Sequence, residues 1–215
     1  MMRPYVVKQG DYLTKLAHVH GFDADEVWGH PKNDELRAMR PNPELLAPGD
    51  VIHIPVQTKE GLPFTAGTAN RYRASVSRVA VDLVFEDEEG PMAEEPYEVR
   101  GLRGADGEPL NGQTDADGRV HFDVPVTVRE IEILFPRRNV AYTGLVGDMD
   151  PGSEESGIRK RLENLGFLIA GPDLTVDREE ALRGALVAFQ RSRGLPVTGK
   201  LDADTRKALI EAHGA

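Results

Sequence analysis

The sequence predicts a multidomain α+β protein with a small mixed module at its start, a β-rich middle and a helical module at its end. Three observations lead to this fold class. Residues 1–57 read as strand, helix, helix, strand, the middle shows alternating apolar residues, and the last part shows helical periodicity with cap and stop residues. We expect domains over residues 1–57, 71–147 and 158–215, joined by linkers over 58–70 and 148–157.

The N-terminal module is predicted from its strand and helix signals. Short apolar strands are expected at residues 5–7 and 51–55. Between them, Asp11 stands where it can cap a helix, and Gly21 follows the predicted end of that helix. Trp28, on the second helix, is read either as a core residue or as a platform for a sugar ring.

This module contains two motifs, Y-x-V-x-x-G-D-x-L-x-x-L-A at residues 5–17 and L-x-P-G-D-x-I-x-I-P at residues 46–55. Together they resemble the LysM domain, a small glycan-binding module. The resemblance implies a shallow groove for N-acetylglucosamine chains between two loops, lined by Gly10, Asp11, Tyr12, Leu13, Asn42, Pro43, Glu44 and Leu45. Threonine is usual where Tyr12 stands, so the tyrosine either stacks on a sugar or fills the groove.

The middle of the chain is predicted to be a small antiparallel β-sandwich. Apolar residues alternate over 79–86, 97–101, 120–124 and 131–135, and turn signals occur at 105–107, 111–112 and 117–118. This spacing favours roughly four to seven short strands. The pattern G-x-P-L-x-G-x-T-D-x-x-G-x-V-x-F at residues 107–122 resembles transthyretin-like and immunoglobulin-like modules of bacterial surface proteins.

The charge is concentrated in this middle part. The chain carries a net charge of −10, and residues 58–152 hold 10 basic and 18 acidic residues, a net charge of −8. Because no basic stripe is present to neutralise phosphates, we expect neither a nucleic acid nor a membrane as partner. The chain contains no cysteine, which excludes disulfides and thiolate sites.

The C-terminal module is predicted to contain three short helices. Apolar residues recur at helical spacing from Ile158, and Gly166 ends this first helix. Asp177 is expected to cap the second helix and Asp202 the third. Residues 195–199, LPVTG, form a turn-rich link between them.

This module resembles the peptidoglycan-binding domain found at the ends of many bacterial wall hydrolases. The match lies in R-L-x-x-L-G-F, A-x-x-x-F-Q and G-L-P-V-T-G-x-L-D-x-x-T, within residues 161–205. Most residues of the motif are expected to have structural roles. The residues of the motif that we single out are Arg161, Leu162, Gly166, Phe167, Phe189, Gln190, Gly199, Asp202 and Thr205.

No catalytic, metal or cofactor site is predicted. The six histidines are scattered over all three expected domains, whereas a zinc enzyme needs two or three together with a carboxylate. Asp115-Ala116-Asp117-Gly118 lacks the closing glutamate of a calcium loop and is read as a hairpin turn. The sequence also has no G-x-S-x-G nucleophile motif. We therefore expect a protein that is not an enzyme and has no cofactor.

The combined prediction is a non-catalytic peptidoglycan-binding protein that anchors itself or a partner to the bacterial cell wall. The alternative is an adaptor or delivered accessory of a contractile injection system, docking to spike or baseplate proteins. A third reading is an accessory subunit of a separate wall hydrolase. The start MMRPYVVKQGDYL has no apolar signal-peptide core, so we expect a cytoplasmic protein or one delivered to the wall by a contractile route.

Overall fold

The computed structural model describes residues 1–56, 63–72, 75–87, 89–103, 107–169 and 177–214. The chain divides into two compact units, Met1–Asp148 and Met149–Ala215. Each unit is described by itself. Residues 105 and 106 of the predicted turn at 105–107 lie outside the described residues. Residues 58–62 of the predicted linker also lie outside them.

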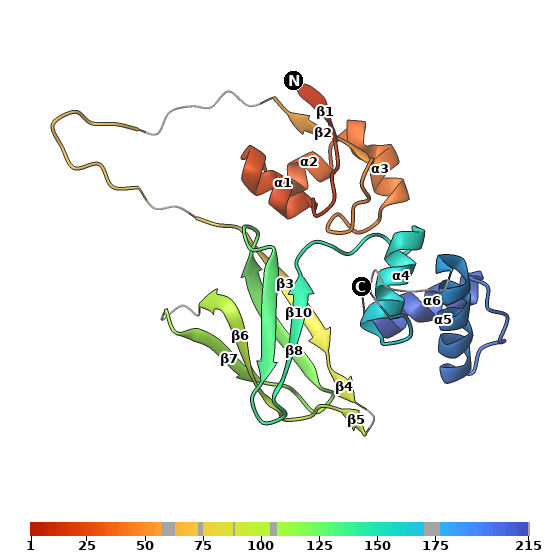
Figure 1. The fold of residues 1–215 in the computed structure, drawn as a ribbon. Helices are drawn as coiled ribbons and strands as arrows, with labels where there is room; N and C mark the ends of the chain where they lie inside the picture. The colour runs from red at the N-terminus through yellow and green to blue at the C-terminus, as the bar shows by residue number, and fades with distance from the viewer. Residues whose placement is uncertain (57–62, 73–74, 88, 104–106, 170–176, 215) are drawn as a thin grey trace. The chain divides into compact units, whose positions relative to one another are not determined.

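The first part of the N-terminal unit begins and ends with a strand as predicted, but four helices lie between the strands where two were predicted (Figure 1). Strands β1 and β2 pair antiparallel, with Tyr5 opposite Ile52. Four short helices lie between them in the sequence, and apolar residues of three of these helices share one core with Ile52 and Ile54. The bounds are β1 Met2–Val6, α1 Leu13–His20, α2 Ala24–Trp28, the 3-10 helix η1 Pro31–Asn33, α3 Asp34–Met39 and β2 Val51–Pro55.

The prediction that Asp11 caps helix α1 is wrong. The helix begins at Leu13, which makes Tyr12 the N-cap residue, and no side chain caps it. Asp11 instead accepts hydrogen bonds from the Tyr5 hydroxyl at 2.8 Å and from the Lys8 backbone N–H at 3.0 Å. Its carboxylate thus closes the β1–α1 loop. The predicted helix end is confirmed, because Gly21 is the C-cap in the left-handed conformation.

The second part of the N-terminal unit is all β (Figure 1). One antiparallel sheet has the strand order β10-β9-β6-β7, and β3 pairs with β8 in a separate two-stranded sheet. Residues from both sheets share one apolar core that includes Val99, Phe122 and Phe135. The bounds are β3 Arg78–Val84, β4 Glu86–Asp87, β5 Gly90–Pro91, β6 Pro96–Arg103, β7 Pro109–Gln113, β8 Arg119–Pro125, β9 Glu130–Phe135 and β10 Val140–Leu145.

The predicted turn at Asn111-Gly112 is wrong, because both residues lie inside strand β7. Gly112 is paired with Tyr97 of β6, and a Cβ on Gly112 would come within 2.4 Å of the Tyr97 hydroxyl. The glycine therefore makes room for the tyrosine ring across the strand pair. The turn at Asp117-Gly118 is confirmed, since the Gly118 N–H donates to the Asp115 carbonyl at 3.1 Å.

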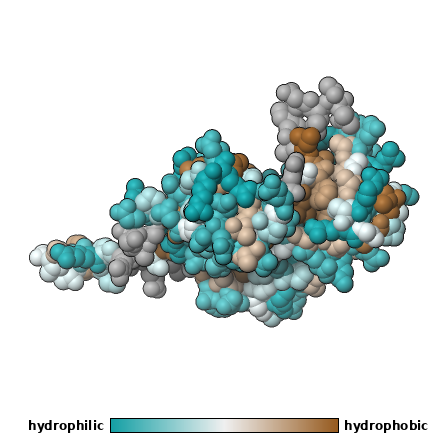
Figure 2. Space-filling model, turned by 90° about the horizontal axis from the view of Figure 1, so that it is seen from below, coloured by the Kyte–Doolittle hydropathy of each residue, from teal (hydrophilic) through white to brown (hydrophobic). Residues whose placement is uncertain are grey.

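The C-terminal unit contains helices α4 Glu155–Asn164, α5 Arg178–Ser192 and α6 Ala203–His213 (Figure 1). Their apolar faces meet in one core around Ile158, Leu162, Phe189 and Leu209. Asp177 and Asp202 cap α5 and α6 as predicted, each accepting a backbone N–H bond. The surface seen in Figure 2 is formed largely by hydrophilic residues.

Candidate functional site

The two loops predicted to form an N-terminal groove do meet. The Leu13 N–H donates to the Pro43 carbonyl at 3.1 Å, and the Thr14 hydroxyl donates to the Glu44 carboxylate at 2.7 Å. Most of the side chains in these two loops pack in the core or form hydrogen bonds within the loops. Leu13 belongs to the core, and the exposed Asn42 accepts the Glu44 N–H in a local turn. Leu45 and Pro43 are half-buried.

Tyr12 is the most buried polar residue of this predicted groove, with 3% of its surface exposed. A Cβ at Gly147 would lie 2.6 Å from the Tyr12 ring, so this glycine permits close packing on the aromatic face. Gly10, in the left-handed conformation, has its carbonyl bonded by the Lys15 ammonium. The tyrosine thus fills space between loops in this structure and offers no open face to a sugar ring.

Two buried polar atoms of the predicted groove residues are the Tyr12 hydroxyl and one carboxylate oxygen of Glu44. Neither has a hydrogen-bond partner within the described residues. Burial, followed by the charge of Glu44, raises the pKa of Tyr12 to about 12. Burial also raises the pKa of Glu44, although the bond from Thr14 opposes this shift. The phenol therefore stays protonated at neutral pH and available as a donor.

The C-terminal unit is organised around the side-chain amide of Gln190, which is completely buried. Its oxygen accepts the backbone N–H groups of Thr198 and Gly199, both at 2.9 Å. Its nitrogen donates to Thr198, to the Lys200 carbonyl and to the Thr205 hydroxyl at 2.9–3.1 Å. One side chain of α5 thereby fixes the 195–199 link and ties it to α6.

The remaining residues of the C-terminal motif are placed in the core or at helix ends. Phe167 packs edge-on against Phe189, with ring centroids 5.4 Å apart. Gly199 is in the left-handed conformation, and a Cβ there would lie 2.9 Å from Arg183. Buried core positions are held by Leu162, Arg161 and Thr205, whereas Gly166 follows α4 and Asp202 caps α6.

Residues 153–209 match the family model of the peptidoglycan binding domain. The match spans helices α4 to α6 and the link that Gln190 holds. Searches of curated proteins and of solved structures give no match for the chain. The LysM-like and transthyretin-like or immunoglobulin-like assignments of the earlier residues are not tested by these comparisons and stay predictions.

The C-terminal unit keeps a charged residue, Arg161, almost fully buried. Its guanidinium donates to the carbonyls of Asp150 and Gly157, both at 2.9 Å. Burial lowers the pKa of Arg161, and burial followed by the Arg161 charge lowers the pKa of His213 to about 4. His213 is thus neutral at pH 7, and its ring contacts the Asn164 amide at 3.0 Å.

The ordered 195–199 link exposes an apolar side chain of the C-terminal unit. Val197 is 49% exposed although it is apolar, and Arg193 lies over the Phe189 ring at 5.9 Å from the centroid. The sequence motif contained Val197, but nothing in its spacing indicated Arg193. A loop that is already ordered loses little conformational entropy when it binds a ligand.

The described residues contain no group of three His, Asp or Glu side chains placed to hold a metal ion. They also contain no helix with the length and apolar character needed to span a bilayer.

Proposed function

We propose that the protein binds peptidoglycan without cleaving it and anchors itself or a partner to the bacterial cell wall. The observation that carries this proposal is the match of residues 153–209 to the peptidoglycan binding domain. The link fixed by Gln190 supports it, because a preorganised loop presents Val197 without an ordering cost. A LysM-like N-terminal module on the same chain would raise the effective concentration of a second weak contact.

The test is co-sedimentation of the full chain with insoluble peptidoglycan sacculi, using wild type and the Val197→Asp variant. We expect wild type to pellet and Val197→Asp to bind about tenfold more weakly, since a charge replaces an interface apolar group. Ile169→Asp is the matched control, because Ile169 is exposed in the same unit but lies off the link. Equal binding by Val197→Asp and wild type would move the contact surface elsewhere. No pelleting by wild type would refute wall binding.

A second candidate is protein docking, as an adaptor or delivered accessory of a contractile injection system. Two observations favour docking over glycan binding for the N-terminal unit. Tyr12 is buried at the predicted groove, and residues 58–152 carry the net charge of −8. This candidate expects salt-sensitive capture of a basic spike or baseplate protein, measured with purified components.

A further inference from the structure

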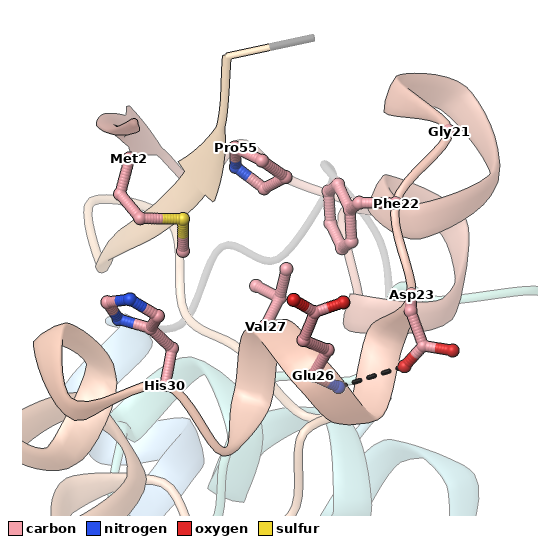
Figure 3. A pocket seen from close by; sticks show the side chains of 8 residues that line it. All are labelled: Met2, Gly21, Phe22, Asp23, Glu26, Val27, His30 and Pro55. Carbon is pink, nitrogen blue, oxygen red and sulfur yellow. Dashed lines mark hydrogen bonds between the residues drawn. The ribbon is translucent and has the colours of Figure 1, made fainter.

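A cavity of about 320 Å³ lies in the first part of the N-terminal unit, away from the predicted groove loops in sequence (Figure 3). Its volume is at the lower end of the roughly 300–1,000 Å³ typical of small-molecule sites. Strand, loop and helix residues all contribute to it. The lining residues are Met2, Gly21, Phe22, Asp23, Glu26, Val27, His30 and Pro55.

The floor of this cavity is apolar. Met2 of β1 and Pro55 of β2 are paired in the sheet, and Val27 of α2 is buried in the core beneath them. Phe22 is half-buried and stacks parallel to the His20 ring at 6.5 Å. An unbranched aliphatic chain would remove these surfaces from water together with its own, which favours its entry.

One side of the cavity is acidic. Asp23 uses one carboxylate oxygen to accept the Glu26 backbone N–H at 2.9 Å and so caps α2. The side chain of Glu26 has no such task, and Figure 3 shows its carboxylate beside Val27 at the cavity. Neither carboxylate forms an ion pair with another described residue. Two negative charges at the edge of an apolar pocket attract a cation that carries an apolar stem.

His30 supplies a donor to the same cavity. Its Nδ1 accepts the Lys32 backbone N–H at 3.1 Å, so a neutral His30 ring carries its proton on Nε2. An N–H donor is suited to a carbonyl oxygen of a ligand. Together the cavity offers acceptors for a cation, an apolar floor for its stem, and a donor for a neighbouring carbonyl.

We infer that this cavity binds a lysine-type side chain in peptide linkage, with the ammonium at Glu26 and Asp23 and a peptide carbonyl at His30. A metal ion is the competing cation. Asp23, Glu26 and His30 line one cavity, but no three ligating side chains of the described residues are placed so that they could hold a metal ion together, which disfavours a metal here. The aliphatic floor adds an attraction that only an organic cation can use. This inference goes beyond the proposed function, because it concerns the N-terminal unit and not the family-matched domain.

The test is an NMR titration of the full chain with N-acetyl-lysine methylamide. The matched probe is N-acetyl-norleucine methylamide, which has the same peptide groups and an apolar side chain without the ammonium. We expect the lysine probe to shift the signals of Met2, Phe22 and Val27 with a Kd on the order of millimolar. The norleucine probe should bind at least about threefold more weakly. Equal shifts with both probes, or none with either, would overturn the inference.

Glu26→Gln provides the matched variant, since it removes the charge and keeps the shape. We expect it to weaken the lysine probe by about three- to tenfold. Glu35→Gln is the control, because Glu35 is an exposed carboxylate in the first turn of α3 just as Glu26 is in the first turn of α2. Equal affinity in Glu26→Gln and Glu35→Gln would contradict the assigned role of Glu26.

Two further titrations identify the source of the side chain. One uses a soluble wall stem peptide with a free diamino-acid amine, and the other a lysine-containing protein peptide. Binding of either one that Glu26→Gln weakens supports the inference, and the tighter of the two names the source. If Glu26→Gln binds these peptides as tightly as wild type does, the result counts against the inference. The co-sedimentation assay with Val197→Asp tests the C-terminal unit, whereas the lysine titration tests the cavity in the N-terminal unit. The proposed function and this inference can therefore fail independently.

Discussion

At the scale of single residues, we expect that removing the Tyr12 hydroxyl does not lower the free energy of unfolding. Its hydroxyl is buried without a hydrogen-bond partner in the described part of the chain. Leaving a buried donor unsatisfied costs stability, so removing it should cost nothing. We expect Tyr12→Phe to keep the free energy of unfolding or raise it by about 1 kcal/mol. Denaturant unfolding of the full chain measures this change.

Tyr5→Phe is the matched control for Tyr12→Phe. The Tyr5 hydroxyl donates to Asp11 at 2.8 Å, so its removal should lower the free energy of unfolding by about 1 kcal/mol. If both variants lose stability equally, the Tyr12 hydroxyl has a partner such as an ordered water.

His213 gives a prediction on pH dependence. Its folded-state pKa is lowered to about 4 by burial and by the Arg161 charge, whereas an unfolded histidine titrates near about 6.5. Between these values the unfolded chain binds a proton that the folded chain does not. The stability contribution is therefore complete above pH 6.5 and is lost as pH falls towards 4.

The NMR titration of the imidazole checks the His213 pKa directly, and unfolding at pH 7 and pH 4.5 checks its consequence. His213→Gln should lose less stability between these two pH values than wild type does. His121→Gln is the control for loss of an exposed imidazole, since that side chain is 60% exposed. A measured His213 pKa near 6.5 would contradict the burial argument.

At the scale of elements, Asn33 joins three elements of the N-terminal module. It is completely buried in η1, donates to the Val27 carbonyl of α2 at 2.8 Å, and donates to the His53 carbonyl of β2 at 3.0 Å. Its oxygen also accepts the His53 N–H at 2.7 Å. Asn33→Ala leaves these backbone groups unsatisfied, and we expect it to cost about 2–4 kcal/mol of unfolding free energy.

Denaturant unfolding of Asn33→Ala beside Lys32→Ala tests this element-joining role. Lys32 is exposed in the same short helix, so its change should stay within about 0.5 kcal/mol. A loss below about 1 kcal/mol for Asn33→Ala would mean that water replaces its bonds. Such a result would remove Asn33 as the link between α2 and β2.

Elements with local signals were predictable from the sequence. Gly21, Asp177 and Asp202 mark helix ends in the structure because capping depends on neighbouring backbone groups. Prediction failed where a distant partner decides the outcome. The Asp11 carboxylate accepts a hydrogen bond from the Tyr5 hydroxyl and does not cap the helix. Gly112 lies in a strand, where a side chain would collide with the ring of Tyr97 on the neighbouring strand.

The same distinction applies to the sites. The sequence motif pointed to Gln190, and the structure adds that its amide orders the 195–199 link. The strand β10 was missed, because its residues show no alternation and most are exposed. The cavity was also missed, since Met2, Phe22, Glu26 and Pro55 come from four places in the chain that only the fold brings together.

At the scale of the whole molecule, separate cores predict separate local unfolding. The core around Ile52 draws only on residues of the N-terminal module, and the core around Phe189 only on residues of the C-terminal unit. Gln190→Leu breaks five hydrogen bonds inside the second core and leaves buried N–H groups unsatisfied. We expect it to cost about 3 kcal/mol of local unfolding free energy, which is roughly a hundredfold faster amide exchange.

Hydrogen exchange followed by mass spectrometry reads both modules in one experiment. Gln190→Leu should accelerate exchange in residues 177–214 and leave residues 1–56 as in wild type, because the partners of the Gln190 side chain all lie within residues 198–205 and sites without shared partners are energetically independent. Asn33→Ala should do the reverse, so each variant is the control for the other. Faster exchange in both modules from either single change would mean that they unfold together. Wall binding would then have to be analysed as a property of one cooperative molecule, because a change in one module would also alter the other.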